Sequence, residues 1–148
     1  MTDKTMTLGA RLLAAKADEL EHPVEAARKK AEREGKGKYF AAAVEFFKRF
    51  KKDVELCADE GRMPKWVEFT SEEDAAFEGY TWYRLKPPAG EPPMSRTHYT
   101  YPLWMEFLEW AKEQGLQVKW RGCHDGGGER SWGEVMVVPI PAPLDFRA

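Results

Sequence analysis

The sequence is poor in cysteine and contains no long apolar run. The first shortage argues against a disulfide-rich protein and the second against a membrane-spanning one. Its two cysteines, Cys57 and Cys123, are too few for a disulfide scaffold, which favours a reducing compartment. No apolar run approaches the roughly 18 residues of a membrane-spanning helix. The first residues also lack the basic and then apolar layout of a secretory signal. We therefore expect a cytoplasmic protein that does not bind a membrane.

Motifs for phosphate or cofactor chemistry are missing as well. The triple glycine at 126–128 is not followed by Gly-Lys-Ser/Thr, so a phosphate-binding loop is not indicated. A net charge of −2 favours no class of partner, and a composition that is 43% hydrophobic and 32% charged is typical of a globular protein. We expect no cofactor and a single α+β domain covering residues 1–148.

Four stretches of the chain favour helices. The clearest lies between Tyr39 and Glu60, where apolar residues recur every three or four positions. The stretch 23–34 has a much weaker apolar face of Val24, Ala27 and Ala31, so residues 1–36 are a candidate for a peripheral helical arm. The patterns predict helices over about 7–20, 23–34, 39–60 and 101–114.

The remaining ordered segments favour strands. Leu116, Val118 and Trp120 alternate with polar residues, which is typical of a strand with one buried face. The run 132–140 is apolar on both faces around its middle and is expected to be central. Prolines exclude regular structure from 87–93. The sequence predicts a small, mostly antiparallel sheet of strands at about 65–70, 79–86, 116–122 and 132–140, packed against the helices.

Aromatic residues exceed what one small core readily holds, and they favour a binding surface. Exposed Trp and Tyr are common at protein interfaces because one end of the side chain is apolar and the other polar. The polar loop 123–131 is longer than a hairpin needs, and loops of this kind often bind partners. We expect it to become ordered against a partner. The candidate contact residues are Tyr80, Trp82, Tyr83, Tyr99, Tyr101, His124, Asp125, Arg130 and Trp132.

A basic segment offers an alternative partner, nucleic acid. Residues 28–52 contain 10 Lys or Arg and 3 acids, which could follow a phosphate backbone. The segment 68–78 carries 5 acids and no base, so ion pairs within the fold could absorb part of this charge. No helix-turn-helix, RNA-recognition or zinc-finger signature accompanies it. The basic residues are Arg28, Lys29, Lys30, Arg33, Lys36, Lys38, Lys48, Arg49, Lys51 and Lys52.

The group Cys123, His124 and Asp125 raises a second alternative, an enzyme or a metal site. A thiol beside an imidazole can act as nucleophile and base. Adjacent residues of an extended chain point to opposite faces, however, which disfavours that contact. The spacing also matches no standard zinc pattern.

The leading hypothesis is therefore a small cytosolic, non-enzymatic interaction protein. It would act as a regulator or inhibitor by binding another macromolecule, with a protein as the expected partner. The sequence leaves its oligomeric state open.

Overall fold

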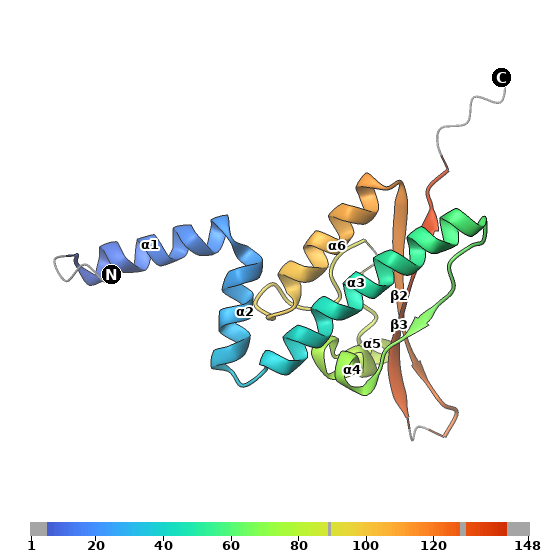
Figure 1. Cartoon of the computed structure of the whole chain (residues 1–148). Helices are drawn as coiled ribbons and strands as arrows, with labels where there is room; N and C mark the ends of the chain where they lie inside the picture. The colour runs from blue at the N-terminus through green and yellow to red at the C-terminus, as the bar shows by residue number, and fades with distance from the viewer. Residues whose placement is uncertain (1–5, 89, 128–129, 142–148) are drawn as a thin grey trace, which may run out of the picture.

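The computed structural model describes residues 6–88, 90–127 and 130–141. Helices occupy the N-terminal half, a small antiparallel sheet follows, and a further helix packs on that sheet (Figure 1). The α+β class predicted from the sequence is confirmed.

The first three helices begin and end close to the predicted positions. They are α1 (Leu8–Glu21), α2 (Pro23–Arg33) and α3 (Gly37–Glu60). Thr7 caps α1, because its side chain accepts a hydrogen bond from the Ala10 N–H at 3.1 Å. Gly61 ends α3 with a φ of 69°, a left-handed conformation that glycine adopts without steric cost.

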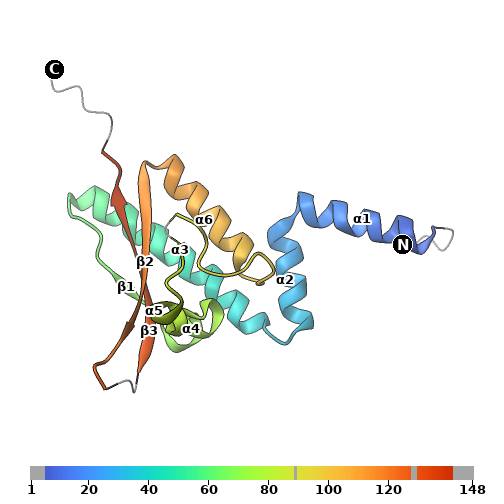
Figure 2. The same cartoon turned by 180° about the vertical axis from the view of Figure 1, so that it is seen from behind.

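Helix α1 stands apart from the rest of the chain. In Figure 1 and Figure 2 it projects away from the sheet and the other helices. None of its residues is buried, and Leu8, Leu12, Leu13 and Leu20 are each more than 70% exposed. Helix α2, in contrast, buries Ala27 and Ala31. No helix among the described residues is long and apolar enough to cross a bilayer.

The core forms where α3 meets α6 (Tyr101–Glu113). The Phe47 ring lies 4.7 Å from that of Phe107 and 5.4 Å from those of Phe77 and Trp104, measured between ring centroids. Such tilted and edge-to-face pairs are the favoured arrangements of aromatic rings. The apolar stripe predicted for α3 is therefore buried against α6 and the short helix α4 (Ser71–Phe77).

The sheet has the strand order β1–β3–β2 and is antiparallel. Strand β1 (Val67–Glu68) is much shorter than the predicted 65–70, whereas β2 (Leu116–His124) and β3 (Ser131–Pro139) pair along their full length. As predicted, β3 is central. Because the pairing reaches His124 and Ser131, the expected nine-residue loop 123–131 shortens to 125–130, of which 128 and 129 lie outside the described residues.

The strand predicted over 79–86 is wrong. This segment forms a 3₁₀ turn, η1 (Gly79–Thr81), and a short helix, α5 (Trp82–Leu85). Glu78 before it and Lys86 after it have φ angles of 55° and 44°, which interrupt an extended chain. The aromatic content that suggested a strand serves the core instead, because Trp82 is only 2% exposed and its ring centroid lies 5.3 Å from that of Phe69.

Candidate functional site

The two faces of the sheet differ in what covers them. On the inner face, Val118, Val135 and Val137 are buried beneath the helices. Helices α5 and α6 and the turn η1 pack on this side, and Figure 1 shows the sheet nearly edge-on with α5 and α6 on one side of it. Among the described residues, the opposite face is left to solvent. We call it the outer face; it carries Trp66, Glu68, Lys119, Arg121, Cys123, Trp132, Glu134 and Met136.

Two tryptophans on or beside the outer face each carry a stacked arginine. The Arg121 guanidinium lies 4.0 Å from the centroid of the Trp66 ring, and that of Arg130 lies 4.6 Å from the Trp132 ring. A cation placed over an indole is attracted by the negative face of the ring. The stacking also shields part of each half-buried ring from water. The result is an aromatic surface that can remain exposed.

Glu134 holds this arrangement together from the centre of β3. One of its carboxylate oxygens accepts a hydrogen bond from the Arg121 Nε–H at 2.7 Å, and the other accepts one from the Trp132 indole N–H at 2.9 Å. Burial opposes ionisation, but the hydrogen bonds from Trp132 and Arg121 outweigh it and lower the pKa of Glu134. The carboxylate is thus ionised at neutral pH and fixes both partners.

The charges of the outer face are nearly balanced. Arg130 forms an ion pair with Glu68 of β1, as Arg121 does with Glu134. These ion pairs join residues from separate strands and from the loop before β3. The surface therefore offers aromatic area and fixed polar groups rather than a strong positive field.

The arrangement of Cys123, His124 and Asp125 does not bring a nucleophile and a base together. Cys123 pairs with Trp132 on the outer face, whereas the His124 ring lies 4.9 Å from that of Tyr83 on the inner side. Burial and the neighbouring Glu134 raise the pKa of the Cys123 thiol, which is the opposite of what a nucleophilic cysteine needs.

Metal ligation finds no support in residues 6–88, 90–127 and 130–141. No three His, Cys, Asp or Glu side chains in these ranges come together as a possible ligand set. Asp125 is exposed, and its backbone N–H donates to the Arg130 carbonyl at 3.0 Å.

The predicted contact residues Tyr80, Trp82, Tyr83, Tyr99 and Tyr101 fall into three groups by their exposure. Trp82 and Tyr99 are core residues, only 2% and 7% exposed, so the prediction that they are exposed contact residues is wrong; Trp82 also borders a cavity beside β2. Tyr80, in the turn η1 on the inner side, is 43% exposed and lines a small cavity together with Asp74 and Arg130. Tyr83 and Tyr101 are half-buried at other places in the fold.

Sequence reasoning missed three central members of the outer face: Trp66, Arg121 and Glu134. A signal for two of them exists in the alternation of the strands. Arg121 follows the inward-facing Trp120, and Glu134 precedes the inward-facing Val135. Pairing the two predicted strands in register would have placed both on the outer face. The stacking of Arg121 on Trp66 could not be found this way, because it depends on how β1 joins the sheet.

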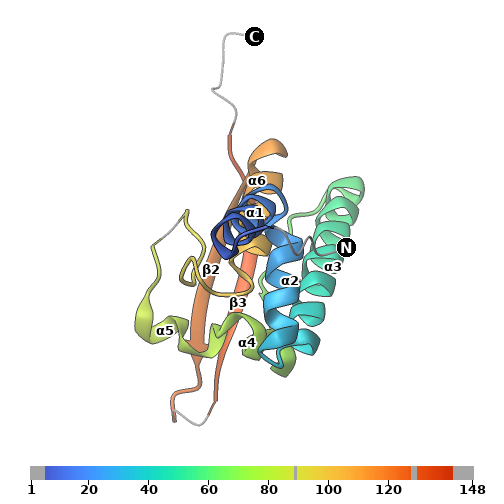
Figure 3. The same ribbon diagram turned by 90° about the vertical axis from the view of Figure 1, so that its left-hand side faces the viewer.

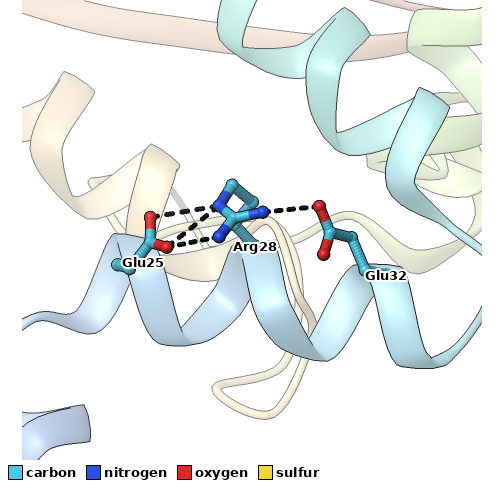
Figure 4. A network of polar contacts seen from close by, with 3 residues as sticks. All are labelled: Glu25, Arg28 and Glu32. Atoms are coloured by element: carbon cyan, nitrogen blue, oxygen red, sulfur yellow. Dashed lines mark hydrogen bonds and ion pairs between the residues drawn. The ribbon is translucent and has the colours of Figure 1, made fainter.

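The basic residues of 28–52 are largely engaged within the fold. Figure 4 shows Arg28 between Glu25 and Glu32, with an Arg28–Glu32 contact of 2.5 Å. Arg49 pairs with the buried Glu73, and Lys48 lies 3.7 Å from Glu45. The remaining contacts are of other kinds: the ammonium groups of Lys36 and Lys38 lie over the Tyr39 ring, that of Lys51 lies over Trp110, and Lys30 donates to the Thr97 carbonyl.

Comparisons with models of protein families, with curated proteins and with solved structures found no match to this chain.

Proposed function

We propose that this protein is a non-enzymatic interaction protein, a regulator or inhibitor, that binds a partner protein through the outer face of its sheet. The observation that carries the proposal is the pair of tryptophans, Trp66 and Trp132, each stacked with an arginine on a face that the described helices leave open. Trp and Arg are the residue types most enriched among the contacts that dominate protein–protein affinity.

The fixed geometry of the outer face supports the proposal. Glu134 restrains Trp132 and Arg121 before any partner arrives, so less side-chain freedom is lost on binding. A partner that covered the face would remove the water around these rings and strengthen the ion pairs beneath it. Of the predicted contact residues, Trp132 belongs to this surface and Arg130 stacks on its ring from the loop before β3.

The charge balance favours a protein over nucleic acid as the partner. A surface that binds a phosphate backbone needs cations that can replace the counterions of the phosphates. On the outer face, Arg121 and Arg130 are already paired with Glu134 and Glu68. The basic residues of 28–52 remain the alternative surface for nucleic acid.

The test is capture of partners from a lysate of the cells that naturally produce the protein, with and without nuclease. A bait carrying both Trp66→Ala and Trp132→Ala is compared with the wild type and with Trp110→Ala. Trp110 is a matched control, because it is also half-buried and has a lysine over its ring, but it lies on α6. We expect a protein that the wild type and the Trp110 variant retain, with or without nuclease, and that the double variant loses.

Two results would contradict the proposal. One is equal retention of that protein by the double variant, whose fold is checked by its thermal melt. The other is loss of that protein both after nuclease treatment and after substitution of Lys48, Lys51 and Lys52 by Glu. This outcome would assign the binding to nucleic acid held by the basic segment 28–52.

A further inference from the structure

Strand β2 lies at the edge of the sheet, and its hydrogen-bonding pattern shows which backbone groups face outward. The Asp125 N–H donates to the Arg130 carbonyl and the Ile140 N–H to the Gly115 carbonyl, at the two ends of the β2–β3 pairing. Because hydrogen-bonded pairs alternate along an antiparallel ladder, odd-numbered residues of β2 face β3. The backbone N–H and C=O groups of Val118, Trp120 and Gly122 therefore point to the free edge.

This edge has no strand beside it in the described part of the chain. No backbone hydrogen bond joins Val118, Trp120 or Gly122 to the segment between α5 and α6, where residues 86–88 and 90–100 are described. In Figure 3 this segment rises beside β2. Residues 86–88 and 90–100, which we call the wall, therefore run beside the edge of β2 but form no backbone hydrogen bond with Val118, Trp120 or Gly122.

Two cavities lie between this wall and β2. One, of about 530 Å³, is lined by Leu116 and Val118 of β2, by Leu108 of α6 and by Met94 and Arg96 of the wall. The other, of about 480 Å³, is lined by Trp120, Gly122 and His124 of β2 together with Tyr83 and Lys86. Apolar surface makes up somewhat more than half of each lining, beside charged residues such as Glu109 and Lys112 in the first and Lys86 in the second, and the two cavities follow one another along the strand.

The side chains of β2 define what an added strand would contact. Inward-facing Leu116 and Val118 border the first cavity, and inward-facing Trp120, Gly122 and His124 border the second. Val118 and Gly122, one at each cavity, lie four residues or roughly 13 Å apart along the strand. An added strand would place side chains i and i+4 on this same face. On the outer face it would place i+1 and i+3 beside Lys119, which is exposed, and Arg121, whose side chain is 49% exposed although it is paired with Glu134.

We propose that the free edge of β2 binds an extended segment of a partner protein as a fourth, antiparallel strand. The segment has apolar side chains at i and i+4, which enter the two cavities, and acidic side chains at i+1 and i+3. Backbone hydrogen bonds to Val118, Trp120 and Gly122 supply affinity that does not depend on sequence, and the cavities supply selectivity. This site goes beyond the outer-face function, because it uses the edge of the sheet and neither of the stacked tryptophans.

The experiment measures fluorescence polarisation with the full chain and a labelled peptide, acetyl-Thr-Leu-Glu-Val-Glu-Phe-Thr-amide. In an antiparallel added strand, the Leu, Val and Phe residues turn their N–H groups towards β2 and the Glu residues turn theirs away. N-methylation of the Val should weaken binding about tenfold or more, because it removes a hydrogen bond and adds bulk at the edge. N-methylation of the first Glu should change affinity by no more than about twofold.

Charge reversal provides an independent check. Lys119→Glu, at an exposed position, should weaken the acidic peptide about threefold to fivefold, and a peptide with Lys in place of both Glu residues should recover the loss. The single variant Trp132→Ala, which leaves Arg121 stacked on Trp66, should bind the peptide like the wild type, so failure of the outer-face function and failure of the edge site are distinguishable. Equal losses for the two N-methylated peptides, or no saturable binding up to about 1 mM peptide, would overturn the edge site.

Discussion

Successive residues of β2 and β3 lie alternately on the inner and outer faces of the sheet, and different forces stabilise the two faces. On the inner face, Val135 and Val137 are fully buried, and their contribution is the removal of apolar surface from water. On the outer face, the Arg121 side chain is 49% exposed and the contacts are stacked cations and hydrogen bonds to Glu134. Substitutions on the inner face should therefore lower mainly the stability of the protein, whereas substitutions on the outer face should weaken mainly its binding to a partner.

The largest expected effect is on the core that covers the inner face. Phe47→Ala should lower the free energy of unfolding by about 3–5 kcal/mol, because the truncation leaves a cavity among Phe77, Trp104 and Phe107. Met136→Ala is the matched outer-face variant, half-buried in β3, and should cost about 1 kcal/mol or less. Denaturant melts measure both; equal losses would remove the distinction between the faces.

A second prediction concerns the close approach of α5 to the inner face. A Cβ atom at Gly122 would lie 2.0 Å from the Tyr83 backbone nitrogen, and backbone cannot move aside as a flexible side chain does. Gly122→Ala should therefore cost about 2–3 kcal/mol by forcing α5 away from the strand. Gly127→Ala in the same hairpin is the control, because nothing lies within 4 Å of its Cβ position. A thermal melt of Gly122→Ala that matches the control would show that α5 does not need this contact.

A third, smaller effect should appear as a dependence on pH. The Asp74 carboxylate accepts a hydrogen bond from the Gly133 N–H at 2.8 Å, which ties α4 to β3. Burial raises the pKa of Asp74 to about 6, from 3.8. A carboxyl group whose pKa is raised by folding favours the folded state below pH 3.8 and loses that contribution as the pH rises through about 6.

Asp74→Asn keeps an acceptor for Gly133 but does not titrate. Its free energy of unfolding relative to the wild type should therefore increase by about 1–2 kcal/mol between pH 4 and pH 7, after allowance for solvent screening. Urea melts of both proteins at the two pH values measure this difference. A difference that stays constant with pH, or that falls as the pH rises, would contradict the raised pKa.

The comparison of the two faces also shows what the sequence could predict. Helices were predictable because their apolar spacing is local; the stripe of α3 is visible in the sequence and buried in the structure. The same kind of stripe on α1 remains exposed, because burial depends on where the connection at His22 and Pro23 directs the helix. Periodicity predicts a helix but does not determine what covers it.

The error at 79–86 and the missed residues of the outer face have a common cause. Tyr80, Thr81 and Trp82 are residue types that are common in strands. In this fold, however, β1 and β2 already pair with the two edges of β3, so the segment cannot pair with β3. The capping box of Thr70 and Glu73 starts α4 just before this segment and directs the chain into a turn. Which segments pair is a property of the whole fold, and Trp66 reaches Arg121 only through that pairing.

The smallest effect on stability is expected at the tip of the hairpin, where the two faces meet. The Asp125 N–H bonds to the Arg130 carbonyl, so this pair can flank a two-residue turn. Replacing residues 126–129 by Asn-Gly should leave the free energy of unfolding within about 0.5 kcal/mol of the wild type, because a shorter loop costs less entropy to close.

The replacement keeps Arg130 stacked on Trp132 and paired with Glu68. If the outer face binds the partner, capture should therefore be retained. Loss of capture with an unchanged melt would instead show that the loop itself makes the contact, whereas loss of stability would show that the tip is part of the scaffold that sets the β2–β3 register.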